Sequence, residues 1–82
     1  MRLIVLSLSA PQADTLEDAL LTFSALRPAI TCAPGQEGRY GLSVTAKSLP
    51  ECVDALNLYR QHIHDDRCIR GLVALLQKGA QA

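Results

Sequence analysis

The sequence predicts an α+β domain, a two-layer sandwich of ferredoxin-like β-α-β-β-α-β order with an antiparallel sheet. Within 82 residues, the same pattern of apolar run, helix-like stretch and extended run occurs twice at nearly equal offsets. Alternating apolar and polar residues from 39 to 47 indicate a half-buried strand, and the 49% hydrophobic content suffices for a packed core. We therefore expect a single domain over residues 1–78 and a frayed tail over residues 79–82.

The first unit begins with residues 3–6, which are apolar on both alternating faces, as is typical of a strand in the middle of a sheet. A helix follows, with Ser9 or Ala10 as its cap and Pro11 in its first turn. The helix should end at Arg27, because the residue before a proline avoids the α region. Its expected inward stripe is Ala13, Leu16, Ala19, Leu20 and Phe23.

A short strand is expected from Ala29, and a Pro- and Gly-rich loop over residues 34–38 separates it from the next strand. The strand over residues 39–47 has one wet face and one inward face. The inward set is Tyr40, Leu42, Val44 and Ala46.

The second helix opens at Leu49 behind a capping box, with Ser48 as the cap and Glu51 three residues later. Two leucines, Leu21 and Leu58, fall outside the inward stripes of their helices, so we expect both to be exposed. The inward stripe of this second helix is Leu49, Cys52, Val53, Leu56 and Ile63.

The segment 67–77 allows two interpretations. Gly71 and the internal repeat favour a fourth strand beside the first one, which leaves Leu72 and Leu76 on the sheet face away from the helices. The abundance of Leu and Ala favours a helix capped by Asp66 and stopped by Gly79, which gives the order β-α-β-β-α-α. Periodicity does not decide between them for a short apolar run, and we adopt the strand. The helix would bury Ile69, Leu72, Val73 and Leu76.

The net charge and the number and spacing of the cysteines limit the classes of protein to which this chain can belong. The formal net charge is zero, whereas nucleic-acid binders usually carry a basic excess. Cys32, Cys52 and Cys68 are odd in number and widely spaced, which predicts reduced thiols in a cytoplasmic protein rather than a disulfide framework. We expect neither a signal peptide nor a membrane span. The excess of arginine over lysine suggests a bacterial or phage genome.

No motif points to catalysis, a cofactor or a metal, and we expect none of the three. On a helix, His62 and His64 lie about 200° apart and cannot close on one ion. Cys52 falls on the apolar stripe, and about 15 Å of helix separates it from the histidines. The glycines after the second strand lead into another strand, so they cannot form a phosphate cradle at a helix N-terminus.

These observations predict a small non-enzymatic protein-binding module, such as a regulator, adaptor or inhibitor. We expect it to act through an open sheet face or an exposed helix and to form a homodimer. The interface candidates are Leu3, Val5, Leu21, Leu58, Leu72 and Leu76. One alternative is a nucleic-acid-binding module that uses Arg2, Arg39 and Lys47, although too few aromatic residues are present for base stacking. A second alternative is a small-ligand sensor with its site between protomers.

Overall fold

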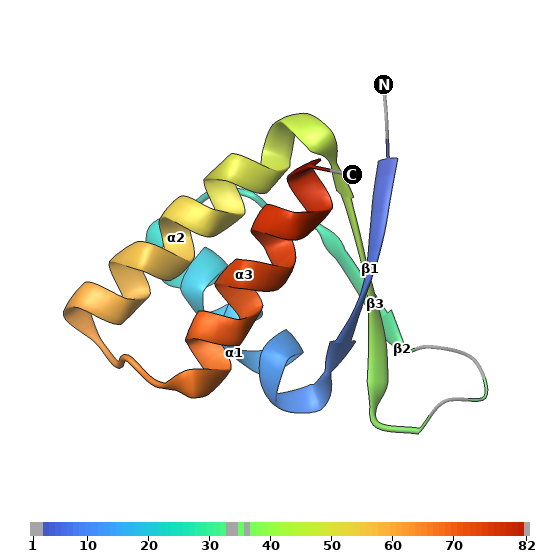
Figure 1. The fold of residues 1–82 in the computed structure, drawn as a ribbon, viewed down its shortest axis with the longest axis horizontal. Helices are drawn as coiled ribbons and strands as arrows, with labels where there is room; N and C mark the ends of the chain where they lie inside the picture. Colours follow the sequence, from blue (N-terminus) through green and yellow to red (C-terminus); the bar gives the residue numbers. More distant parts are fainter. Residues whose placement is uncertain (1–2, 33–34, 36, 82) are drawn as a thin grey trace.

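A computed structural model describes residues 3–32, 35 and 37–81, and it shows an α+β fold of two layers. Three helices pack together on one face of a three-stranded antiparallel sheet, and the other face of the sheet is left bare (Figure 1). The elements are β1 (Leu3–Ser9), α1 (Ala10–Phe23), β2 (Ala29–Cys32), β3 (Arg39–Thr45), the 3₁₀ turn η1 (Ala46–Ser48), α2 (Leu49–His62) and α3 (Arg67–Gln81).

The sheet has the strand order β1-β3-β2, so β1 lies at an edge. The expectation that the first strand lies in the middle of the sheet is therefore wrong. Both strand pairs are antiparallel, with Leu3 opposite Thr45 in one and Ile30 opposite Leu42 in the other. This is the expected arrangement of the first three strands, without a fourth strand beside β1 in the described part of the chain.

The C-terminal segment is a helix, so the predicted fourth strand is wrong and the alternative order β-α-β-β-α-α is confirmed. The Asp66 carboxylate accepts a hydrogen bond from the Ile69 N–H at 3.0 Å and thereby caps α3. In a helix, the spacing of the large apolar residues in this segment places them on one side. In a strand, where successive side chains alternate between two faces, the same residues would be divided between the faces. Its buried residues are Ile69, Leu72, Val73 and Leu76.

Residues 79–81 belong to α3 rather than to a frayed tail. Gly79 is buried, and a Cβ atom at this position would lie 3.2 Å from a methyl carbon of Leu6. The absence of a side chain therefore lets the end of α3 approach β1 closely. This contact attaches the last turns of α3 to the inner face of the sheet.

The start of α1 agrees with the prediction. The Ser9 Oγ accepts from the Gln12 N–H at 3.3 Å, and the Gln12 side-chain oxygen accepts from the Ser9 N–H at 2.9 Å. This reciprocal pair is a capping box, and Pro11 occupies the first turn behind it. The helix ends at Phe23, a few residues before the expected stop at Arg27.

The predicted capping box at the start of α2 is wrong. The 3₁₀ turn η1 places Ser48 in a helical conformation, and its hydroxyl lies 2.9 Å from the Thr45 hydroxyl instead of capping α2. Glu51, the expected partner in the box, accepts a hydrogen bond from the Ser24 hydroxyl. Ile63 follows the last residue of α2 and is 52% exposed, so its expected burial is wrong too.

One hydrophobic core fills the space between the sheet and the three helices. No polar or charged side chain is buried among residues 3–32, 35 and 37–79, for which burial is defined. None of the described helices is long and apolar enough to cross a membrane. The largest fully buried side chains are Leu8, Leu16, Leu20, Leu42, Leu49, Leu56, Ile69, Leu72 and Leu76.

Candidate functional site

The sheet face opposite the helices, here called the outer face, is not covered by any element of the described chain (Figure 1). Leu8, Leu42 and Val44 point into the core, so their neighbours along each strand point outward. The antiparallel register then places the outward side chains of adjacent strands side by side. The outer face comprises Leu3, Val5, Ser7, Ala29, Thr31, Arg39, Gly41, Ser43 and Thr45.

Two apolar side chains dominate the outer face. Leu3 and Val5 are 62% and 66% exposed, more than any other large hydrophobic residue in the described chain. Val5 lies opposite Ser43 and Leu3 opposite Thr45, so each apolar group has a hydroxyl-bearing neighbour on β3. A small apolar centre with a polar rim is typical of surfaces that associate with proteins.

The outer edge of β1 is the second feature of this site. Alternate residues of an edge strand direct their N–H and C=O groups away from the sheet. In the described chain, the backbone hydrogen bonds outside regular elements involve no residue of β1. Ile4 and Leu6, on the inner face of β1, are only half-buried, so apolar surface is exposed on both sides of this strand.

The six predicted interface residues do not form one patch. Leu3 and Val5 lie on the outer face as expected, but Leu72 and Leu76 are fully buried in the core and cannot contact a partner. Leu21 on α1 and Leu58 on α2 are exposed as expected. They belong to the helical layer, away from the outer face.

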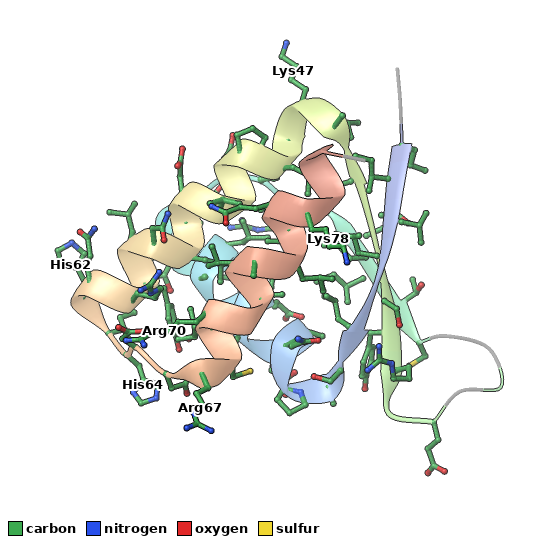
Figure 2. The ribbon with its side chains drawn as sticks, viewed as in Figure 1. Lys47, His62, His64, Arg67, Arg70 and Lys78 are labelled. Carbon is green, nitrogen blue, oxygen red and sulfur yellow. The ribbon has the colours of Figure 1, made fainter. Side chains whose placement is uncertain are left out.

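The residues proposed for nucleic-acid binding are also dispersed. Arg39 donates a hydrogen bond to the Ser7 hydroxyl at 2.9 Å, and Arg2 lies outside the described residues. Lys47 extends from η1, and the whole of β3, about 24 Å at 3.4 Å per residue, separates it from Arg39 (Figure 2). Two cations so far apart do not create the continuous basic stripe that phosphate contacts require.

A denser group of charged residues surrounds the α2–α3 connection, where Figure 2 labels His62, His64, Arg67 and Arg70. Asp65 bridges the two helices, with its oxygens 3.2 Å from the Arg60 guanidinium and 2.9 Å from that of Arg70. The hydrogen bond from Arg70 is the main reason that the pKa of Asp65 lies below its usual value. These cations are therefore already paired with a carboxylate and hold the connection in place.

The two histidines have separate surroundings. The His62 ring lies 6.1 Å from the Phe23 ring, measured between centroids, at the contact of α2 with α1. His64 lies 2.9 Å from an oxygen of Asp66. The hydrogen bond from the Ile69 N–H is the main reason that the pKa of Asp66 is lowered, and His64 adds to the shift. Asp66 therefore acts as a helix cap.

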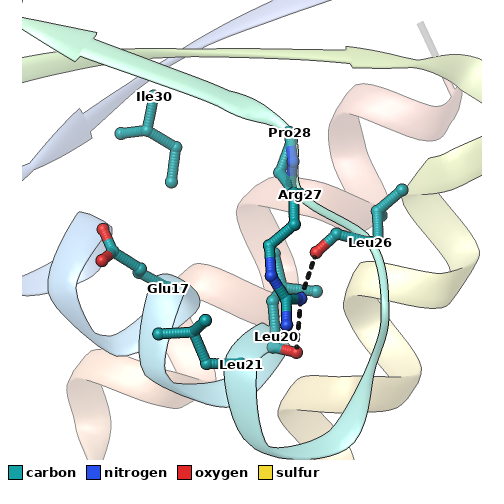
Figure 3. Close-up of a pocket in the computed structure, with 7 residues that line it drawn as sticks. All are labelled: Glu17, Leu20, Leu21, Leu26, Arg27, Pro28 and Ile30. Carbon is teal, nitrogen blue, oxygen red and sulfur yellow. Dashed lines mark hydrogen bonds between the residues drawn. The ribbon is translucent and has the colours of Figure 1, made fainter.

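A shallow pocket of about 190 Å³ lies between α1 and β2 (Figure 3). Its arginine, Arg27, donates hydrogen bonds to the carbonyl oxygens of Leu20, Ser24 and Leu26 at 3.2, 2.9 and 2.8 Å. These bonds pair carbonyl oxygens at and just after the C-terminal end of α1, so the Arg27 guanidinium is already hydrogen-bonded to the backbone. The volume is also below the range of about 300–1,000 Å³ that is typical of small-molecule sites. The lining residues are Glu17, Leu20, Leu21, Leu26, Arg27, Pro28 and Ile30.

The cysteines do not form a reactive centre. Cys52 is fully buried, and burial, assisted by the charge of Glu51, raises the pKa of its thiol to about 11. A thiol with this pKa is almost entirely protonated near neutral pH and is a poor nucleophile. Cys32 is exposed at the end of β2, and Cys68 is half-buried in α3.

Comparison with known proteins finds no matching family model, and no significant similarity to a curated protein or to a solved structure. The function is therefore inferred from the sequence and structure of this chain. Sequence reasoning missed the unpaired edge of β1 because it placed residues 67–77 there. The available signal was the Asp66 cap followed by apolar residues at helical spacing.

Proposed function

We propose that this protein is a small non-enzymatic protein-binding module, a regulator, adaptor or inhibitor, that associates through β1 and the outer face. The observation that carries the proposal is the combination, on one strand, of an unpaired backbone edge and the two most exposed large apolar side chains, Leu3 and Val5. A strand edge that carries no charge and is left uncovered is a ready template for pairing with another chain.

Strand addition is the binding mode that fits this edge. A partner strand would pair with the outward N–H and C=O groups of β1, and pockets beside the strand would select its side chains. Each hydrogen bond formed in this way contributes about 0.5–1.5 kcal/mol net. Burial of the exposed apolar area of Leu3 and Val5 adds about 25 cal/mol per Å².

The cytoplasm is the compartment that we propose for this protein. Three unpaired thiols, one of them exposed, suit a reducing environment better than an oxidising one.

Affinity capture with matched variants tests the proposed function. Val5→Lys places a charge on the outer face, and Leu21→Lys places the same charge at an exposed position of α1, where Leu21 is 55% exposed. Both variants should fold, because each side chain is solvent-exposed. We expect the unaltered protein and Leu21→Lys to capture the same partner from a native lysate, and Val5→Lys to lose it at least tenfold. Equal capture by all three proteins would contradict the proposal.

A further inference from the structure

The edge of β1 lacks the features that normally prevent one strand edge from pairing with another. Its sequence, LIVLSLS, contains no charged residue and no proline. The register against β3 is one-to-one over all seven residues, so no bulge twists the edge away. The opposite edge, β2, is different: it has only four residues and follows Pro28 directly. Only the β1 edge is therefore long, flat and apolar.

We infer that the edge of β1 pairs with β1 of a second copy of this chain, giving a continuous six-stranded antiparallel sheet. The strand order across the dimer is β2-β3-β1-β1-β3-β2, with the two-fold axis between the central strands. This inference rests on the proposed function, because it names one partner of the same surface. It supplies the fourth strand that the chain itself does not provide.

The strand is complementary to its own copy. A two-fold axis at Val5 places the two Val5 side chains opposite each other on the outer face, with Leu3 opposite Ser7. On the inner face the same axis places Ile4 opposite Leu6. Cβ atoms of directly opposed residues lie about 4.5–5.5 Å apart, so each copy covers the exposed side chains of Leu3 and Val5 and the partly buried side chains of Ile4 and Leu6 in the other.

Charge also favours a second copy as the occupant. Neither of the paired strands contains a charged residue, and the Arg39 guanidinium bonded to Ser7 of β1 lies beside Leu3 of the other copy rather than beside a like charge. The net charge of zero means that two copies do not repel each other at long range. An extended segment of another protein could form the same hydrogen bonds, but a second copy also places Val5 against Val5 on the outer face and Ile4 against Leu6 on the inner face.

The contact area sets the strength of the dimer. An axis at Val5 pairs residues 3–7 of the two copies, so five residues at about 3.4 Å per residue give a contact about 17 Å long, and a layer thickness of about 10 Å gives roughly 170 Å² per copy in projection. A stable interface buries about 800 Å² per partner. The dimer is therefore expected to be reversible and to form at high concentration.

Sedimentation velocity of the purified protein from about 10 µM to about 1 mM tests the inference. We expect the mean mass to rise toward twice the chain mass with concentration. Val5→Lys should raise the dissociation constant at least tenfold, and Leu21→Lys should leave it unchanged. Far-UV circular dichroism checks that both variants fold. If Val5→Lys loses its fold, Leu3→Lys, at the first residue of the strand, makes the same test.

The outcomes separate this inference from the proposed function. A constant monomer mass up to about 1 mM would overturn the second copy as occupant, and the capture experiment would still decide whether β1 binds another protein. A dimer that persists in the folded Val5→Lys and Leu3→Lys variants would overturn the placement at β1. A dimer lost in both and kept in Leu21→Lys would support it.

Discussion

The burial of Leu72 distinguishes the helix observed in the C-terminal segment from the strand that the sequence also allowed. In α3 this side chain is completely buried, whereas in a fourth strand it would lie on the bare face of the sheet. Truncation of a buried leucine to alanine costs about 2–5 kcal/mol, because it removes apolar contacts and leaves a cavity. A domain of this length has a free energy of unfolding of about 4–12 kcal/mol. Leu72→Ala should therefore remove a large part of the stability.

Urea unfolding followed by far-UV circular dichroism measures this loss. Leu21→Ala is the matched control, because Leu21 is an exposed helical leucine and its truncation should change stability by no more than about 0.5 kcal/mol. In thermal unfolding, each kcal/mol corresponds to about 4–8 °C in a domain of this size, so Leu72→Ala should lower Tm by at least about 8 °C. Equal, small effects of the two substitutions would refute the burial of Leu72 in the core.

Three further predictions concern α3 and the cysteines. Gly71→Ala should stabilise the protein by about 1 kcal/mol, because Gly71 is an exposed helical residue with open space around its missing Cβ, and a lower Tm would contradict this. Asp66→Ala should lower the unfolding free energy at neutral pH through loss of the cap, as measured by urea unfolding. Because the pKa of Asp66 is lowered in the fold, its contribution is present above the ordinary value of 3.8 and is lost as the pH falls below it, so the two proteins should converge in stability in acid. At pH 8, the exposed Cys32 should react with a thiol-specific disulfide reagent. Cys52, which is buried and has its pKa raised to about 11, should react only when the protein unfolds. Fast labelling of Cys52 in the folded protein would contradict its burial.

Much of the fold follows from local patterns that were strong and unambiguous. The alternation in residues 39–47 predicts a strand, which the structure confirms over residues 39–45, and of the two predicted caps, Ser9 and Ala10, the structure confirms Ser9. The α2 start was less secure, because the 3₁₀ turn that draws Ser48 toward Thr45 depends on how β3 leaves the sheet. This geometry is set by tertiary contacts, which the spacing of residues in the sequence does not reveal.

The C-terminal segment shows why a short apolar run cannot be assigned from periodicity alone. Its leucines satisfy alternation and helical spacing equally well, and Gly71 disfavours a helix only weakly. Burial decides the matter, because the helix places both Leu72 and Leu76 in the core, while the strand would leave them on the bare face. The internal repeat was misleading, because it predicted a second extended run where the chain forms a helix.

The candidate site was predicted in part. Leu3 and Val5 were predicted to lie on the sheet face away from the helices, and both are exposed there. The unpaired edge was missed, because it exists only when residues 67–77 form a helix. The error about one segment thus placed two buried leucines on the predicted surface and concealed a strand edge.

Amide hydrogen exchange of β1 tests the central claim most directly. If the edge of β1 accepts β1 of a second copy, the outward N–H groups of residues 3–7 should exchange more slowly at high protein concentration than at low concentration. The amides of β2, at the other edge, should exchange at the same rate in both samples. Exchange from β1 that is independent of concentration would contradict the account.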